Sequence, residues 1–191
     1  MKKVLLTLAL TAVCAASFAQ GKVNMNNDAT RAITFGSSIK LGDVAGTLAA
    51  QVNGSGASLL VDLFGGTTAG TMTLQQTTTM GPVAGIFGPR TFTAVGVAGG
   101  VDTFWQVKVR EASFATAEAS ATGGGYSGFS PVFTFRASTT IAFNAINNTG
   151  GTALSTWAAA PVLITANVPE PTSMALAGIG AAAMVIFRRR K

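Results

Sequence analysis

The chain has 191 residues, a net charge of +6, one cysteine and no histidine. The excess of basic residues lies at the two ends, because residues 20–168 carry seven Lys or Arg against six Asp or Glu, a net charge of +1. A main segment without a basic stripe excludes the electrostatic footprint of a nucleic-acid-binding protein. The lack of histidine excludes Ser-His-Asp and Cys-His catalysis and most zinc or copper sites.

The N-terminus is typical of a secretory signal peptide. Two lysines precede an apolar run over residues 4–16, and small residues then lead to a cut between Ala19 and Gln20. Residues 1–19 are therefore predicted to be a removable signal. The Sec translocon and signal peptidase are the partners expected for it.

The single cysteine, Cys14, allows a second interpretation of this end. In a lipoprotein the mature chain would begin at that cysteine with lipid attached, but Val13 stands before it, where lipoprotein signals carry Gly, Ala or Ser. Ordinary cleavage ahead of Gln20 is therefore favoured. The mature chain would then contain no cysteine and no disulfide, so its stability must come from burial and backbone pairing.

Residues 20–167 are predicted to form one all-β domain, because short apolar runs with a period of two alternate with glycine-rich turns. The clearest strand covers residues 101–110, where Trp105 lies on the apolar face. Further strands are expected over residues 32–39, 47–53, 57–64, 71–78, 91–97, 132–136, 139–146 and 162–166. Asn53-Gly54 is a hairpin candidate. The pattern favours a single antiparallel β-sandwich or jelly roll.

One segment of this domain departs from the strand pattern. Residues 113–121 are rich in alanine, Ser113 could cap their start, and Gly123-Gly124-Gly125 would end them. We therefore expect a short helix on a connection between strands.

Few side chains of the domain could carry chemistry. The six carboxylates could supply a glycosidase-like pair or a calcium site, but they are scattered along the sequence. The polar cluster of Asn24, Asn26, Asn27 and Asp28 lacks the spacing of an EF-hand. We therefore expect no catalytic residue, no metal site, no cofactor and no enzymatic activity.

Tyr126 and Phe129 are the candidate ligand-binding residues. They lie in a glycine-rich segment, where an exposed aromatic ring could stack on the apolar face of a sugar. Trp105 and Trp157 are the other aromatic side chains that could serve this role, but Trp105 is expected in the core because it lies on the apolar side of its strand. Closing the end of a sandwich is the alternative role for Tyr126 and Phe129.

The C-terminus combines a proline-bracketed motif, an uncharged apolar segment and a basic end. The motif residues are Val168, Pro169, Glu170 and Pro171, and the basic residues are Arg188, Arg189, Arg190 and Lys191. As a helix, residues 172–187 would be about 24 Å long, against about 30 Å for a hydrocarbon core, but flanking cations can snorkel to the headgroups. We predict a transmembrane helix over residues 172–187 with the basic end on the cytoplasmic side.

This order of features resembles the PEP-CTERM sorting signal of Gram-negative envelope proteins, here over residues 168–191. The resemblance implies that an exosortase-type membrane protease is a partner. It also implies a precursor anchored in the inner membrane with its domain in the periplasm, and a mature form at the cell surface or outside the cell.

The stretch from residue 60 to residue 136 resembles a group of uncharacterised PEP-CTERM proteins from verrucomicrobial-type genomes. The residues that carry this likeness are Val61-Asp62-Leu63-Phe64-Gly65-Gly66, Phe104-Trp105-Gln106-Val107-Lys108-Val109-Arg110 and the Gly-Gly-Gly-Tyr-Ser that ends with Ser127. The group supplies no activity. We therefore expect an exported surface or extracellular-matrix protein associated with exopolysaccharide or biofilm, and the alternative is a carbohydrate-binding module for surface polysaccharide.

Overall fold

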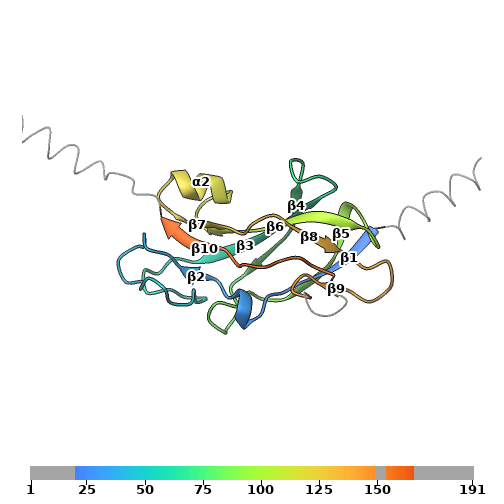
Figure 1. Cartoon of the computed structure of the whole chain (residues 1–191). Helices are drawn as coiled ribbons and strands as arrows, with labels where there is room; N and C mark the ends of the chain where they lie inside the picture. Colours follow the sequence, from blue (N-terminus) through green and yellow to red (C-terminus); the bar gives the residue numbers. More distant parts are fainter. Residues whose placement is uncertain (1–19, 149–153, 166–191) are drawn as a thin grey trace, which may run out of the picture.

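Ten strands, one α-helix and one 3-10 turn occupy residues 20–148 and 154–165, which are the residues that the computed structural model describes (Figure 1). The strands are β1 (Gln20–Met25), β2 (Thr34–Phe35), β3 (Leu59–Gly66), β4 (Thr73–Thr79), β5 (Arg90–Ala98), β6 (Asp102–Glu111), β7 (Tyr126–Phe129), β8 (Phe133–Arg136), β9 (Asn144–Ala145) and β10 (Val162–Thr165). The turn η1 covers Ala29–Arg31, and the helix α2 covers Ala117–Thr122.

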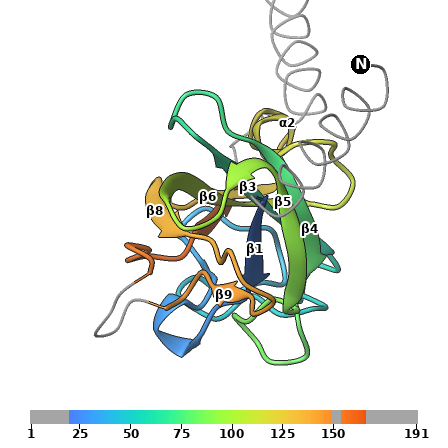
Figure 2. The ribbon, with the colours of Figure 1, turned by 90° about the vertical axis from the view of Figure 1, so that its right-hand side faces the viewer.

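Two mixed sheets enclose one hydrophobic core (Figure 2). The larger sheet has seven strands, in the order β2-β10-β7-β6-β3-β4 with β8 also paired to β6, and the smaller sheet has the order β5-β1-β9. Buried side chains from both sheets belong to the same cluster, for example Val23 of β1 and Val107 of β6. The predicted β class of the domain is therefore confirmed.

The expectation of a wholly antiparallel sandwich or jelly roll is wrong at two pairings. Strand β1 runs parallel to β9, and β10 runs parallel to β2. Parallel neighbours need a long connection, and in both pairs the two strands are far apart in the chain. A period-two pattern shows which face of a strand is buried, but it carries no information about the direction of the neighbouring strand.

Strand β6 follows its predicted pattern closely. Trp105, Val107 and Val109 are fully buried, and Thr103 is buried with them on the same face. The Trp105 indole N–H donates to Thr103 Oγ1 at 2.7 Å, so the one polar atom of this ring is satisfied inside the core. On β3 the ring lies against Gly65, where an added Cβ would come within 2.5 Å of the indole.

The strand predicted over residues 139–146 shortens to β9. Its first half forms local turns instead, because the Ser138 hydroxyl accepts from the Thr140 N–H at 3.1 Å and the Thr140 hydroxyl accepts from the Ala142 N–H at 3.3 Å. Hydroxyl side chains that bond the nearby backbone compete with a strand ladder. Threonine therefore acts here as a turn residue rather than as a β-branched strand residue.

Residues 32–39 keep only β2, and residues 47–53 form turns and one isolated bridge, from Leu48 to Thr34 of β2, rather than a strand. The side chain of Asn53 is buried in these turns, where its amide accepts from the Ala50 N–H and donates to the Ala57 carbonyl, both at 2.8 Å. The buried Asn53 side chain therefore links the backbone at Ala50 to the backbone at Ala57. The hairpin predicted at Asn53-Gly54 does not form.

Two observed strands, β1 and β7, were not among those predicted. In β1 the alternation is present, since Val23 and Met25 are fully buried, but the asparagines between and after them disfavour a strand assignment. Strand β7 is glycine-rich, and it pairs with β10 at a place where the two backbones approach too closely for a side chain on Gly128. A Cβ on Gly128 would lie 2.9 Å from the Val162 carbonyl oxygen.

The helix predicted over residues 113–121 is confirmed as an element, but α2 begins later. The N-cap is Thr116, whose hydroxyl accepts from the Ala119 N–H at 3.1 Å, and not Ser113 as predicted. The helix ends at Gly123, as the glycine run indicated. It packs across β6 and β7 on the outside of the larger sheet.

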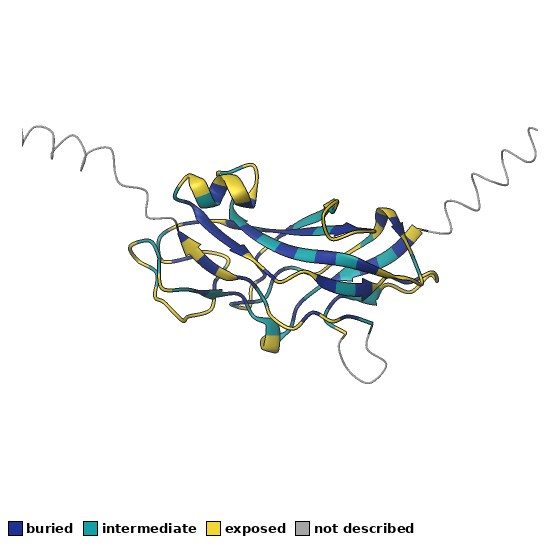
Figure 3. Ribbon diagram, turned by 45° about the horizontal axis from the view of Figure 1, so that its top comes forward, coloured by how far each residue is buried: buried dark blue, intermediate teal, exposed yellow. Residues whose placement is uncertain are grey.

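The described chain begins and ends at opposite ends of the domain (Figure 1). Gln20 starts β1 at one end, and β10 finishes with Thr165 at the other, which we call the tail-exit end. Helix α2 and the loop after β2 lie at the tail-exit end, and Figure 3 shows exposed residues in both. Whatever follows residue 165 is attached there.

Within residues 20–148 and 154–165, no helix is long and apolar enough to cross a membrane. The predicted signal peptide (residues 1–19), sorting motif (168–171), transmembrane helix (172–187) and basic end (188–191) lie outside the described residues. They remain predictions as far as the structure is concerned.

Candidate functional site

The last described strand, β10, is held on both sides. It pairs antiparallel with β7, with Thr165 opposite Tyr126, and parallel with β2. Beyond the end of β2, Ser38 fixes the final residue, because the Thr165 N–H donates to the Ser38 carbonyl at 3.0 Å and the Ser38 hydroxyl donates to the Thr165 carbonyl at 2.8 Å. The exit point of the C-terminal segment is therefore fixed by the fold.

Tyr126 is buried beside this exit point, so its ring is not exposed as a ligand-binding role requires, and its position fits the alternative role of closing the end of the domain. Its hydroxyl donates to Asp43 Oδ2 at 2.6 Å and accepts from the Lys40 N–H at 2.7 Å. The ring packs on Phe35, with 5.0 Å between centroids. Burial, together with the hydrogen bond to Asp43, raises the pKa of Tyr126 to about 12.

The carboxylate of Asp43 is the centre of this group of contacts. Burial opposes its ionisation, but hydrogen bonds from Ser55 and Tyr126 outweigh that cost, and the pKa of Asp43 lies below its ordinary value. Beside it, Lys40 forms an ion pair with Glu111, which also accepts from the Tyr126 N–H at 3.2 Å. We use the name tail-exit cluster for the group that consists of Lys40, Asp43, Ser55, Glu111, Tyr126 and Thr165.

Sequence reasoning missed the tail-exit cluster for a physical reason. Asp43 and Tyr126 are 83 positions apart, and Lys40 and Glu111 are 71 positions apart. No local motif joins them, because the fold alone brings the loop after β2 against β7. The only available signal was Tyr126 itself, and a tyrosine between glycines and serine fits a loop equally well.

Phe129, the second predicted ligand residue, is exposed as expected, on the outer face of the larger sheet. Lys108 lies beside it, with its ammonium 5.7 Å from the Phe129 ring centroid and 4.3 Å from that of Phe64. The same ammonium forms an ion pair with Glu118 of α2 at 2.6 Å. Tyr126 and Phe129 share a strand but face opposite sides of it, so they cannot form one binding surface.

The six carboxylates of the described residues are each engaged by a protein group. Five form ion pairs, and the sixth, Asp43, accepts from Tyr126. The ion pairs are Asp28–Arg31, Asp62–Arg110, Asp102–Arg136, Glu111–Lys40 and Glu118–Lys108. The most enclosed of these is Asp62, whose carboxylate accepts from Arg110 at 2.7 Å and from Thr77 at 2.6 Å.

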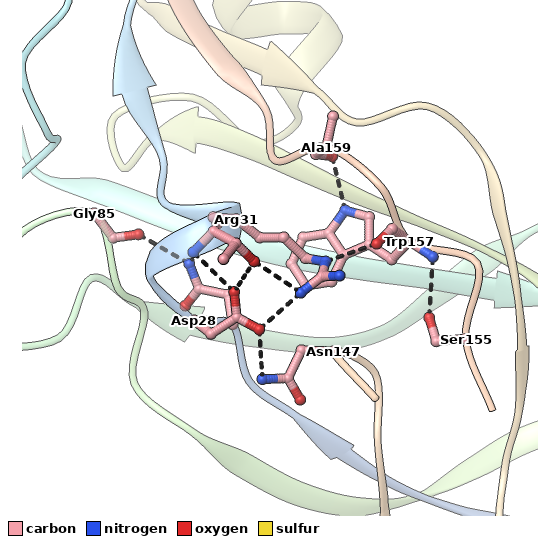
Figure 4. Close-up of polar contacts among 9 residues, drawn as sticks. Asp28, Arg31, Gly85, Asn147, Ser155, Trp157 and Ala159 are labelled. Atoms are coloured by element: carbon pink, nitrogen blue, oxygen red, sulfur yellow. Dashed lines mark hydrogen bonds and ion pairs between the residues drawn. The ribbon is translucent and has the colours of Figure 1, made fainter. Parts of the chain in front are cut away.

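Asp28, from the predicted polar cluster, belongs to a junction that fixes the segment leading to β10 (Figure 4). Its carboxylate accepts from Arg31 at 2.7 Å and from Asn147 at 3.2 Å, and Arg31 also donates to the Trp157 carbonyl at 2.6 Å. The Trp157 side chain is buried and stacks on Phe133. Trp157 therefore offers no ring face to a ligand, and Arg31 fixes the segment before the exit through the Trp157 carbonyl.

Comparison with known families places a sorting signal directly after this exit. Residues 167–191 match the model of the PEP-CTERM protein-sorting motif. Neither the curated proteins nor the solved structures gave a match. The motif implies exosortase-dependent sorting to the cell surface, with an exosortase as the processing partner. The chain is therefore a PEP-CTERM sorting domain-containing protein, with its sorting motif at residues 167–191.

Proposed function

We propose that the β domain is non-enzymatic cargo, which is exported by the N-terminal signal, anchored in the inner membrane by residues 172–187 and cut within Val168–Pro171. The mature protein then serves as a structural component of the cell surface or extracellular matrix. The observation that carries this proposal is the PEP-CTERM motif at residues 167–191, which begins two positions after the last strand.

The short distance between the domain and the motif supports the cargo role. Val168 is three residues beyond Thr165, a reach of at most about 10 Å in an extended chain. The two prolines of the motif disfavour helix and central strand, so the cleavage segment can be taken up in extended form. A processing enzyme would therefore work close to the tail-exit end of the folded domain.

The engagement of all six carboxylates in the described residues supports the non-enzymatic part of the proposal. A glycosidase needs two carboxyl groups that face the same bond, one of them held protonated. Here Asp28, Asp43, Asp102 and Glu118 all have a pKa below the ordinary value, which suits ion pairs and hydrogen bonds rather than acid catalysis.

Replacement of Pro169, Glu170 and Pro171 by alanine tests the sorting step. We expect the full-length precursor to accumulate in the membrane fraction of the native host, with loss of the shorter surface form on an immunoblot. The matched control replaces the adjacent Thr172 and Ser173 with alanine, and its processing should be unchanged. Normal processing of the triple variant would refute the proposed cleavage.

A carbohydrate-binding module is the second candidate, favoured by the exposed Phe129 ring beside Lys108 and Phe64. Exposed rings on a sheet face can stack on sugars. Binding of the exported protein to the host's purified exopolysaccharide should be saturable, and the F129A variant should lose it. The control is V95A, which truncates an exposed apolar side chain on β5. The absence of saturable binding would reject the carbohydrate-binding role and favour the structural role.

A further inference from the structure

We propose that, in the anchored precursor, two adjoining turns at the tail-exit end lie in the membrane interface and seat the domain on the lipid surface. The turns are residues 41–44 and 52–55, which we call the turn pair. This inference rests on the proposed membrane anchor, and it adds a lipid-contacting surface that is separate from the sorting motif.

The topology places the turn pair beside the exit. Because β2 and β10 are parallel, the chain that leaves β2 and the chain that leaves β10 emerge at the same end of the sheet (Figure 1). Ser38 binds Thr165 directly, and the Lys40 N–H donates to Tyr126, which is the partner of Thr165 on β7. Leu41 follows Lys40 in the chain.

The turn pair presents three apolar side chains to solvent. Leu41 is 98% exposed, Val52 is 80% exposed and Val44 is 62% exposed. Single exposed apolar residues are ordinary, but three exposed apolar side chains in two adjoining turns at one end of the domain can enter a bilayer interface together.

The turn pair is held rigidly enough to present these side chains together. Its backbones meet at Gly42 and Gly54, where an added Cβ on Gly54 would come within 1.9 Å of the Gly42 carbonyl oxygen. Gly42 has a φ of +99°, which only glycine adopts readily. The Ser55 N–H also donates to Asp43 Oδ1 at 3.2 Å. The contact of the two turns thus depends on both glycines and on this carboxylate.

The length of the tail brings this end close to the bilayer. Six residues lie between Thr165 and the start of the predicted span at Thr172, and the seven steps from one Cα to the next reach at most about 25 Å. The charged groups next to the turn pair are already engaged, since Lys40 pairs with Glu111 and Asp43 accepts from Tyr126. The charged side chains that approach the lipid are therefore either paired, as Lys40 is, or hydrogen-bonded, as Asp43 is.

Depth-dependent fluorescence quenching of the full-length precursor tests the inference. The precursor is made in a host without exosortase, with Cys14→Ser as background, and reconstituted into phosphatidylcholine vesicles that carry spin-labelled lipid. One variant carries L41C and the matched control carries I141C, each labelled with an environment-sensitive dye. Ile141 is 89% exposed, in a loop beside the start of β1 at the far end of the domain.

We expect the Leu41 label to show a blue-shifted emission and strong quenching by the spin-labelled lipid, and the Ile141 label to show neither. Equal behaviour of the two labels in precursor that resists alkaline extraction would overturn the inference and leave the anchor intact. Release of the precursor by alkaline extraction would refute the anchor and this inference together. Quenching of the Leu41 label only after exosortase is added would assign the turn pair to the protease and also overturn it.

Discussion

The Tyr126 hydroxyl joins β7 to the loop after β2. It donates to Asp43 and accepts from the Lys40 N–H inside a buried site. Tyr126→Phe would remove both hydrogen bonds and leave their partners unsatisfied, which costs about 1–3 kcal/mol of unfolding free energy. Urea unfolding of the purified exported protein at pH 8 measures this loss. A variant as stable as the parent would show that the hydroxyl contributes nothing.

The same tyrosine predicts a specific alkaline response. Its pKa rises from 10.0 to about 12 on folding, so the folded state favours the neutral form. The stabilisation is fully present below pH 10 and is lost as the pH rises towards 12. The stability difference between the parent and Tyr126→Phe should therefore shrink over this interval in urea titrations. A difference that stays constant from pH 8 to pH 12 would contradict the assigned environment.

Gly65 is the residue on which the Trp105 ring rests. An added Cβ would lie 2.5 Å from the ring, so Gly65→Ala should overpack the core and destabilise the protein by about 1–3 kcal/mol. Gly70→Ala is the matched control, because no atom lies within 4 Å of its Cβ position and its φ is not positive. Thermal unfolding of the two variants compares them directly. Similar melting temperatures would contradict the packing.

At the scale of elements, the Gln75 side chain connects the edge of the larger sheet to β5. Its amide accepts from the Val95 N–H at 2.8 Å and donates to the Val95 carbonyl at 3.1 Å, as a neighbouring strand would. Gln75→Ala should speed amide exchange at Val95 roughly fivefold, the equivalent of about 1 kcal/mol. Gln76→Ala is the control, because Gln76 bonds only the Thr77 carbonyl. Unchanged exchange at Val95 in Gln75→Ala would contradict the bridge.

Elements with a strong local pattern were predictable, and those decided by distant partners were not. The alternation in β6 and the glycines after α2 act within a few residues, so the sequence alone identifies them. The hydroxyls of Ser138 and Thr140 accept hydrogen bonds from the nearby backbone and so favour turns over a strand, and an alternating sequence pattern does not reveal these bonds. The parallel pairing of β10 with β2 depends on a contact across the whole domain.

At the scale of the whole molecule, the sorting motif could be predicted from the sequence and the tail-exit cluster could not. The PEP-CTERM motif is a linear signal, and its residues could be predicted because each of its three parts is contiguous. The tail-exit cluster is assembled from the loop after β2, the end of β6, the start of β7 and the end of β10. Its residues become a group only once the sheet has formed.

The positions of the two ends of the described chain set the orientation of an anchored domain relative to the membrane. The described chain starts at one end of the domain and leaves at the other, so a C-terminal anchor would leave the Gln20 end facing away from the membrane (Figure 1). Antibodies against the loop that contains Ile141 should therefore bind the anchored precursor on spheroplasts. Failure to bind there, with normal binding to the detergent-solubilised precursor, would contradict this orientation.

The mass of the protein recovered from the surface or medium of its native host tests the central claim most directly. If the C-terminal motif is a sorting signal that is cut, intact mass spectrometry should show a chain that begins at Gln20 and ends within residues 168–171, without the apolar segment and the basic end. A mature protein that still ends at Lys191 would contradict the claim.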